Sequence, residues 1–456
     1  MNKKTTTKTN TALSGKSRLV EYRGVSSRQQ SEGKESTFFK TEKREYPMSN
    51  GFMRRVRLVA VAIGGAGLIC SSAAFAGDDK CAAPAKAQCC DKLFNDVGDK
   101  LNEQLSALTK ECCTPKATCG TSCGDSDGSC CLGEPYRLFD EDVTIGGWMQ
   151  FGYHNNATLG GGNDVNTHPD NLNLHQLWLY AEDAADGSCG LDIGWRVDAL
   201  YGVDAQNTQS YGNDPGNYDF QNGLDHGIYG WAIPQAYVDV ASGNLSVKLG
   251  HFFSPVGYEK IAAPSNFFYS HSFAMRRAEP WTHTGVLMTY AAADDLEVYA
   301  GWSAGWDTGF DRTNDGSTFI GGASMDISDD TNVSYIMTLG NFGWREEGYS
   351  HSLVMQTKVT CNLDYIVQSD LVETNAGRDH QFGINQYLIY RVDECLGLGA
   401  RLEWFKADNL SINEMTFGAN IRHDANIIFR PEIRHEWSEA LDYDQTIFGV
   451  DAIITF

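Results

Sequence analysis

The chain has 456 residues, of which 42% are hydrophobic and 21% charged, and its formal net charge is −23. No stretch after residue 77 approaches the roughly 18–20 consecutive apolar residues that a membrane-spanning helix needs, which excludes a helical membrane protein. A membrane β-barrel stays open, because polar lumen-facing residues interrupt its apolar residues at every second position. The acidity argues against nucleic acid as a partner, since phosphates need a basic face.

The N-terminal part of the chain is typical of an export sequence. A basic stretch with three arginines precedes an apolar run and an Ala-Phe-Ala cleavage site at residues 74–76. This order predicts a cleaved signal peptide within residues 48–76. Residues 1–47 lie upstream of a complete signal, so we expect a disordered leader or a mis-assigned start there.

Residues 77–135 form a cysteine-rich segment that we expect in the periplasm. In an exported chain such cysteines favour disulfides, whereas zinc is the weaker alternative because residues 81–131 contain no histidine. Between the cysteines, apolar residues at steps of three and four predict one amphipathic helix, which serves either as an oligomer seam or as a locally packed helix. A Gly/Ser/Asp-rich linker follows at 120–135. The disulfide candidates are Cys81, Cys89, Cys90, Cys112, Cys113, Cys119, Cys123, Cys130 and Cys131.

From Val143 onward the sequence alternates with period 2, which predicts about sixteen strands in residues 136–456. The segments are 143–152, 174–183, 191–200, 236–241, 245–252, 282–291, 296–303, 317–327, 332–341, 351–360, 362–372, 380–392, 396–405, 413–422, 426–437 and 445–456.

The connections between these segments alternate between short and long. The longer ones are 154–173, 201–235, 253–281 and 304–316, followed by shorter ones such as 406–412. An up-and-down antiparallel barrel with an even strand number produces this alternation and places both of its termini at the short-turn rim. A Greek-key sandwich would mix the lengths. The fold class predicted is therefore an all-β transmembrane barrel.

Several strands carry charges on one face and apolar residues on the other. Charges of both signs on a buried face need partners, whereas a wet lumen accepts them. We therefore expect the apolar face in lipid and the charged face in the lumen, with a large soluble barrel or sheet as the alternative. The lumen-facing candidates are Asp192, Arg196, Asp198, Arg401, Glu403, Arg430, Glu432, Arg434 and Glu436.

Aromatic residues gather near the predicted strand ends, as expected of interfacial girdles, although each also suits ordinary packing. They are Trp148, Phe151, Trp178, Tyr180, Trp302, Trp306, Phe342, Trp344, Trp404, Phe405 and Trp437. The chain stops at Phe456 on a last amphipathic strand. This ending resembles the assembly signal of bacterial outer-membrane barrels, which predicts outer-membrane lipid and the barrel assembly machinery as partners.

Four segments carry a family resemblance: GHFFSPVGYE (250–259), FFYSHS (267–272), EPWTHTGVLMTY (279–290) and YAGWSAGWD (299–307). With them the sequence resembles the putative beta-barrel porin family over about residues 140–456, which leaves the cysteine-rich segment outside. The resemblance implies an outer-membrane channel and supplies no catalytic residues.

The aperiodic connection 253–281 is the best candidate for a loop that folds inward and narrows a diffusion channel for small polar solutes or ions. The alternative is a loop that only covers the outer rim. From the net acidity we expect a preference for cations. The constriction candidates are Glu259, Lys260, Arg276, Arg277 and Glu279.

Two other functions compete with a channel. A barrel enzyme needs a nucleophile beside a base, for which Ser270, His271 and His283 are candidates, but the chain contains no G-x-S-x-G or H-E-x-x-H motif. We therefore expect no enzyme, no cofactor and no metal site. A structural anchor or adhesion protein, with a disulfide-linked neck as its working part, is the alternative function. A homo-oligomer is left open as a further partner.

Overall fold

The computed structural model describes residues 135–138, 143–159, 168–212, 227–375, 380–423 and 426–456. The predicted leader, signal peptide and cysteine-rich segment with its helix lie outside these residues and stay predictions. Within the described part, no helix is long and apolar enough to cross a membrane.

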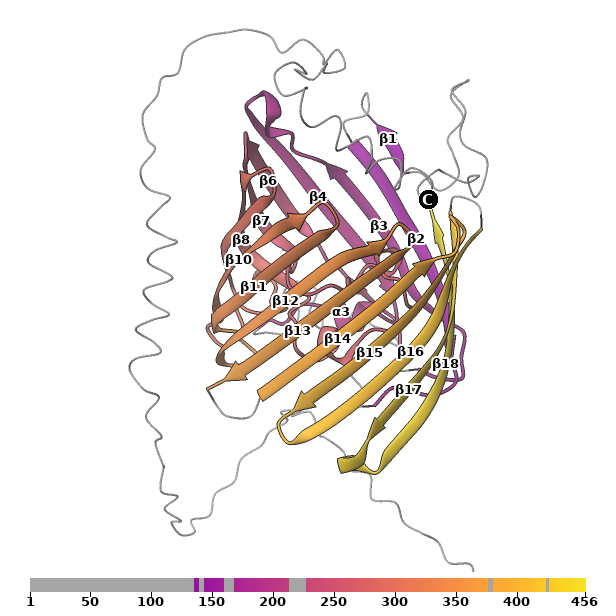
Figure 1. The fold of residues 1–456 in the computed structure, drawn as a ribbon. Coiled ribbons are helices and arrows are strands. Elements are labelled where there is room, and N and C mark those ends of the chain that lie inside the picture. Colours follow the sequence, from indigo (N-terminus) through magenta and orange to yellow (C-terminus); the bar gives the residue numbers. More distant parts are fainter. Residues whose placement is uncertain (1–134, 139–142, 160–167, 213–226, 376–379, 424–425) are drawn as a thin grey trace, which may run out of the picture. The chain divides into compact units, whose positions relative to one another are not determined.

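Sixteen long strands run antiparallel to their neighbours, as the alternation predicts (Figure 1). They are β2 (Val143–His154), β3 (Asn173–Asp183), β4 (Leu191–Gly202), β6 (Ala236–Ser242), β7 (Leu245–Phe253), β8 (Thr282–Ala293), β9 (Leu296–Ser303), β10 (Ser317–Ser328), β11 (Thr331–Asn341), β12 (Glu347–Thr360), β13 (Leu363–Thr374), β14 (His380–Arg391), β15 (Leu396–Ala407), β16 (Leu410–His423), β17 (Ile427–Ser438) and β18 (Tyr443–Thr455). The structure also contains two three-residue strands that the sequence did not predict. β1 (Tyr136–Leu138) pairs with β2, and β5 (Gly230–Ala232) pairs with β4.

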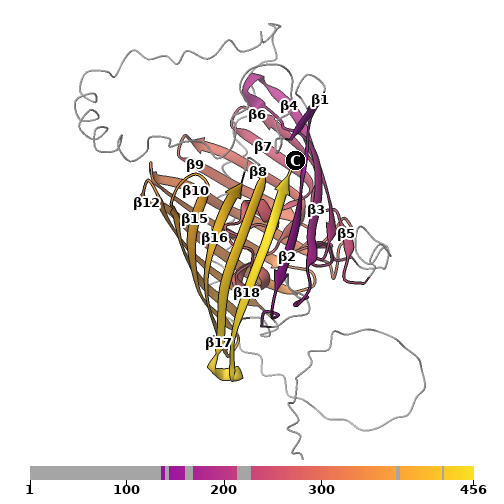
Figure 2. The same ribbon diagram turned by 90° about the vertical axis from the view of Figure 1, so that its right-hand side faces the viewer.

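The sheet closes on itself. Each long strand pairs with the next along the chain, and β18 pairs with β2 (Figure 2). Closure leaves no free edge among these strands, which satisfies their backbone groups without water. The prediction of an up-and-down antiparallel barrel is confirmed.

Both ends of the barrel lie at one rim. The backbone of Phe456 exchanges two 2.9 Å hydrogen bonds with Gly147, near the start of β2. The short turns lie at this rim, and the long connections lie at the other. The strands extend further than expected at the second rim: β15 ends at Ala407 and β16 begins at Leu410, so the connection predicted at 406–412 is a two-residue turn.

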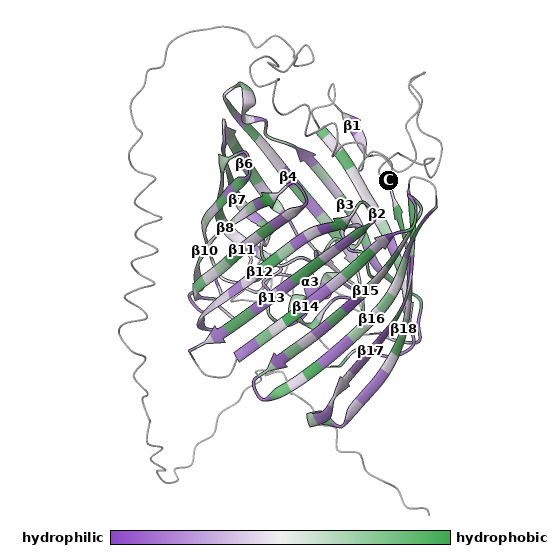
Figure 3. Ribbon diagram, viewed as in Figure 1, coloured by the Kyte–Doolittle hydropathy of each residue, from purple (hydrophilic) through white to green (hydrophobic). Residues whose placement is uncertain are grey.

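The two faces of the strands differ in exposure. Ile193 is 60% exposed and Ile433 is 53% exposed, whereas Asp198 and Arg401 are fully buried. Figure 3 shows the underlying alternation of hydrophilic and hydrophobic residues along the strands. Exposed apolar side chains around a closed sheet are what a bilayer-spanning barrel requires. The soluble alternative, which needs the apolar face in a core, is wrong.

The aromatic girdle is only partly as predicted. Trp148 and Trp178 are buried and stack with ring centroids 4.7 Å apart, and Trp306 stacks on Phe342 at 4.5 Å. These rings fill the interior and face no lipid. Among the other predicted members, Trp302, Trp344 and Trp404 are exposed.

Three cysteines lie in turns of the described barrel. Cys361 and Cys395, in the β12–β13 and β14–β15 turns, are disulfide-bonded. Cys189, in the 3-10 turn η2 (Gly187–Cys189), carries an exposed free thiol.

Candidate functional site

The connection between β7 and β8 is the longest fully described one, and we call residues Ser254–Trp281 the inner loop. It contains a 3-10 turn, η3 (Ala263–Ser265), and a short helix, α4 (Phe273–Arg277). Ser272 begins this helix, because its hydroxyl accepts a 3.1 Å hydrogen bond from the amide of Met275. The loop leaves the sheet at β7 and packs inside the barrel. Its Val256 belongs to a buried cluster with apolar residues of β8, β10 and β11. Its later residues hydrogen-bond to the charged faces of strands across the barrel, among them β13, β15, β17 and β3.

Glutamates of this far wall hold the backbone of the inner loop. Glu432 accepts hydrogen bonds from the amides of Tyr269 (3.0 Å) and Ser270 (3.1 Å). Glu403 accepts from the amides of Phe273 (2.6 Å) and Ala274 (2.7 Å). The latter two amides open α4, where no carbonyl within the helix accepts from them. Both carboxylates therefore bind the loop instead of lining open water.

Arginines of the wall hold carbonyls of the same loop. Arg430 donates from Nη1 to the carbonyls of Ala263 (2.9 Å) and Asn266 (2.8 Å). Arg434 donates from Nη1 to the carbonyl of His271 at 2.6 Å. Donors and acceptors thus alternate along the wall to match the backbone of the loop.

Three arginines of the wall also form ion pairs with acids on the strands. Arg401 pairs with Glu414 at 3.0 Å, Arg430 with Asp451 at 2.5 Å, and Arg434 with Glu436 at 2.5 Å. Burying charges costs free energy unless they are paired, which these ion pairs achieve. Sequence reasoning missed Glu414 and Asp451, although both lie on the predicted charged face.

A second charged group lies on β4. Arg196 pairs with Glu182 at 2.6 Å and with Asp198 at 2.7 Å. Asp192 is half-buried and accepts a 2.7 Å hydrogen bond from the amide of Asp186 in the β3–β4 turn. These residues stabilise the strand pair and the turn.

Glycines on the wall make room for the aromatic tip of the inner loop. A side-chain carbon built at Gly399 would lie 2.3 Å from the ring of Phe267, and one at Gly397 would lie 2.9 Å from it. At Gly418 the same carbon would lie 3.1 Å from Phe268. Only glycine allows the two rings to approach the strands this closely.

Three of the predicted constriction residues stabilise the loop itself. Glu259 is buried and accepts from Arg401 at 2.8 Å, and Glu279 is buried and accepts from Gln368. Lys260 donates from Nζ to the carbonyl of Gly257 at 3.0 Å.

The environment shifts the pKa of each of these three groups. Burial alone would raise the pKa of Glu259, but Arg401 and His271 hold it below its ordinary value. Burial, reinforced by Asp370, raises the pKa of Glu279, and burial lowers the pKa of Lys260.

The other two constriction candidates lie at the edge of the loop. Arg276 donates from Nη1 to the hydroxyl of Thr158 at 2.8 Å, and Arg277 donates from Nη2 to the carbonyl of Leu159 at 3.2 Å. Both arginines are only half-buried. They tie the inner loop to the β2–β3 connection.

The residues considered for an enzyme are not assembled into a catalytic pair. The hydroxyl of Ser270 accepts a 2.9 Å hydrogen bond from Arg401, and no hydrogen bond joins it to His271 in the described part of the chain. His283 instead contacts the hydroxyl of Ser254 at 3.2 Å.

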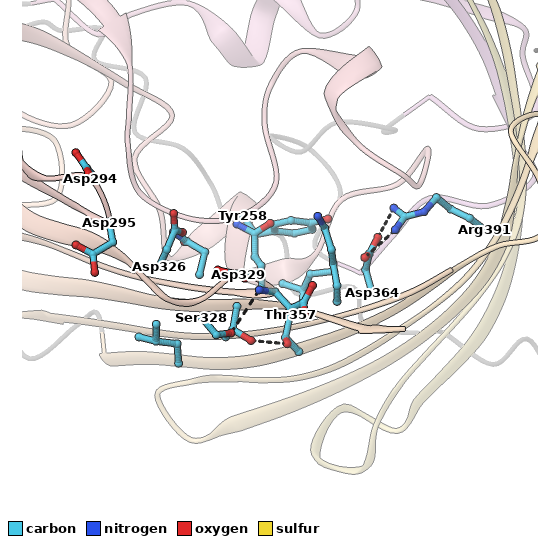
Figure 4. A pocket seen from close by; sticks show the side chains of 16 residues that line it. Tyr258, Asp294, Asp295, Asp326, Ser328, Asp329, Thr357, Asp364 and Arg391 are labelled. Carbon is cyan, nitrogen blue, oxygen red and sulfur yellow. Dashed lines mark hydrogen bonds and ion pairs between the residues drawn. The ribbon is translucent and has the colours of Figure 1, made fainter. Parts of the chain in front are cut away.

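A cavity of about 740 Å³ opens at the short-turn rim, beneath the inner loop (Figure 4). Tyr258 reaches into it from the loop and packs on Tyr387, with ring centroids 4.9 Å apart. The basic residues of its lining are Lys358 and Arg391, and Arg391 forms an ion pair with the acid Asp364. The other acids of its lining are Asp294, Asp295, Asp326, Asp329 and Asp330.

Comparisons with known proteins agree with this architecture. The outer membrane channel DcaP of Acinetobacter baumannii matches with a TM-score of 0.50 and 10% identity, over 71% of this chain and 100% of that chain. The anion-selective porin from Comamonas acidovorans matches with a TM-score of 0.49 and 11% identity, over 69% of this chain and 99% of that chain. The likeness to DcaP shows the barrel fold alone. No curated protein matches the sequence.

The family model described as "Putative beta-barrel porin-2, OmpL-like" matches residues 142–456, which is the whole barrel. The chain belongs to this family of β-barrel porins, which are non-enzymatic barrels of the bacterial outer membrane.

Proposed function

We propose that this protein is a channel for the passive diffusion of small polar solutes or ions, narrowed by the inner loop. The observation that carries the proposal is the orientation of the strands. Their apolar faces are exposed, as lipid requires, while their charged faces turn toward the inner loop and the rim cavity. A sixteen-stranded barrel is wide enough to leave an aqueous path unless loops fill it.

The contacts of the inner loop support its role in narrowing the path. Hydrogen bonds anchor it at Glu403 on β15 and at Arg430 and Glu432 on β17, far from its roots on β7 and β8. A loop held along its length inside the barrel reduces the cross-section that is left for solute. In this arrangement the charged residues of the wall bind the loop and do not contact solutes. They influence the passage of solutes only by holding the loop in place.

The rim cavity supports a preference for cations. Its lining contains six aspartates against one lysine and one arginine. A water-filled mouth with walls of one charge concentrates counter-ions and repels co-ions. Asp329 and Asp330, in the β10–β11 turn, carry this charge at the entrance.

Conductance of the purified protein in planar bilayers tests the proposal. We expect discrete channels, and under a KCl gradient a reversal potential of the sign that cations produce. The variants Asp329→Asn and Asp330→Asn, made singly and together, are expected to reduce that potential, whereas Asp311→Asn, on the β9–β10 connection outside this cavity, is the control for each single change. An absence of channels would reject the diffusion function, and anion preference would reject the role of the acidic cavity.

A further inference from the structure

A group of buried polar side chains joins the end of the inner loop to β12, β13 and β14. Gln368 on β13 donates from its single amide nitrogen to two carboxylates, Glu279 of the loop and Asp370 of β13 (2.8 Å for the latter). Both carboxylates are buried, with 5% and 0% of their surfaces exposed. Two buried acids therefore share one neutral donor.

No basic side chain forms an ion pair with either carboxylate in the described part of the chain. Lys260 is close enough to attract Glu279, but its hydrogen bond goes to the carbonyl of Gly257. An uncompensated buried charge costs several kcal/mol. When both acids are ionised, the pair therefore lacks a full positive charge, because Lys260 attracts Glu279 without forming an ion pair with it.

The atoms around this pair are also without partners. The Oδ1 of Asp370, the Oγ of Ser352, and both the Oδ1 and the Nδ2 of Asn385 are buried without a hydrogen bond. Ser352 lies directly opposite Asp370 in the β12–β13 register, and Asn385 lies opposite Gln368 in the β13–β14 register. Directly opposed residues project on the same face of a sheet, so these side chains lie close to one another. Buried polar atoms in folded proteins are otherwise nearly always satisfied.

The chemistry of these atoms selects the class of ligand. Asp370, Ser352 and Asn385 bring a carboxylate, a hydroxyl and an amide oxygen to one face of the sheet, beside Gln368 and the carboxylate of Glu279 that it binds. Hard cations prefer such oxygen ligands, and calcium accepts carboxylates together with neutral oxygens. Water would satisfy the hydrogen bonds, but it would not balance the charge of Asp370 and Glu279 when both are ionised. Thiol and imidazole ligands, which softer metals prefer, are not among these side chains.

We propose that Asp370, Glu279, Asn385 and Ser352 form a binding site for a hard metal cation that fastens the end of the inner loop to the barrel wall. The site continues the rim cavity: Asp364 and Ile366 line the cavity, and Gln368 and Asp370 follow on the same face of β13. The cation supplies the missing charge, and its coordination takes up the unpartnered oxygens. This role is independent of whether the barrel conducts.

Thermal unfolding of the purified full chain tests the site. The protein is stripped with EDTA in a buffer whose only cation is bulky and organic, and CaCl2 or NaCl is then added at pH 7.5. We expect one of these salts to raise the Tm in a saturable manner by about 5 °C at a hundredfold excess over the dissociation constant. Asp370→Asn retains the shape and the bond to Gln368, and is expected to abolish the rise.

Two further variants separate this site from the acidic rim. Asn385→Leu removes one neutral oxygen and is expected to move the titration to higher cation concentration. Asp364→Asn makes the same chemical change as Asp370→Asn but in the rim cavity, and is expected to retain the rise. An equal rise in the wild type and in Asp370→Asn would place the cation at the rim and overturn the proposal. So would the absence of a rise with either salt, including the case in which only acidification stabilises the wild type.

Discussion

Arg401 on β15 donates a 2.8 Å hydrogen bond from Nη1 to Oε1 of Glu259, and so joins the beginning of the inner loop to the opposite side of the barrel. The same guanidinium bonds the carbonyl of Ser270 at 2.7 Å and pairs with Glu414. One buried cation thus connects two separate points of the loop to two neighbouring strands. The loop is therefore a packed part of the interior and depends on this residue for its position.

Arg401→Met is expected to destabilise the barrel by about 3–5 kcal/mol, because it leaves Glu259 and Glu414 buried without their cation. Urea-induced unfolding in detergent, followed by tryptophan fluorescence, measures the loss. Arg391→Met is the matched control, since its pair with Asp364 is partly exposed at the rim and such pairs contribute at most about 1 kcal/mol. Equal losses for the two variants would contradict the anchoring role of Arg401.

Asp307 predicts a pH dependence at the other end of the loop. Its Oδ1 accepts from the amides of Trp281 (2.7 Å) and Thr282 (3.0 Å), and burial raises its pKa from 3.8 to about 6. A raised carboxyl pKa means that the folded state holds the proton more tightly. Its contribution to stability is therefore complete below pH 3.8 and is lost as the pH rises through about 6.

Between pH 5 and pH 7.5 we expect this group to cost the barrel about 1–2 kcal/mol, since the residue is partly exposed to solvent. Asp307→Asn should flatten that part of the pH profile, measured as the Tm across the same range. Asp315→Asn, at an exposed position of the same connection, should leave the profile unchanged. A profile that stays the same in Asp307→Asn would refute the assignment.

The barrel was predictable because period-2 alternation and turn spacing are local signals. In LGLGARLEWF the outward Leu398 and Leu402 and the inward Arg401 follow directly from that period. The partners of the inward charges were not predictable, because Glu403 binds the amide of Phe273, 130 residues earlier in the chain. Sequence alone therefore gives which face is charged, but not that the loop covers it.

The sequence also carries a signal for the covered wall. Gly397 and Gly399 lie on the same face as Arg401, and adjacent glycines on one face of a strand indicate the close approach of another backbone or ring. The prediction of an aromatic girdle was wrong for the buried rings, because the sequence does not show which aromatic residues face the interior. Trp148 and Trp178 were expected near strand ends, but they lie in the middle of β2 and β3, where they form a buried stacked pair.

Gly399→Ala tests the glycine contact directly. The added methyl group would lie 2.3 Å from the ring of Phe267, so the loop tip has to shift, at an expected cost of about 1–3 kcal/mol. Ala400→Val, on the lipid-facing side of the same strand, adds more volume but should cost little. Urea unfolding compares the two, and an equal or larger loss in Ala400→Val would argue against packing of the loop on this wall.

Arg276 and Arg277 test whether the inner loop limits the current. Their bonds to Thr158 and Leu159 leave both side chains half-buried at the edge of the loop. Replacing both by alanine removes two positive charges and volume from this edge, so single-channel conductance should rise and cation preference should strengthen. Arg312→Ala is the control, because this arginine is 49% exposed on the β9–β10 connection and its pair with Asp315 lies in solvent. Single-channel recordings in which the double variant matches the wild type would show that the current does not pass this edge, and would move the narrowest point of the path to the rim cavity.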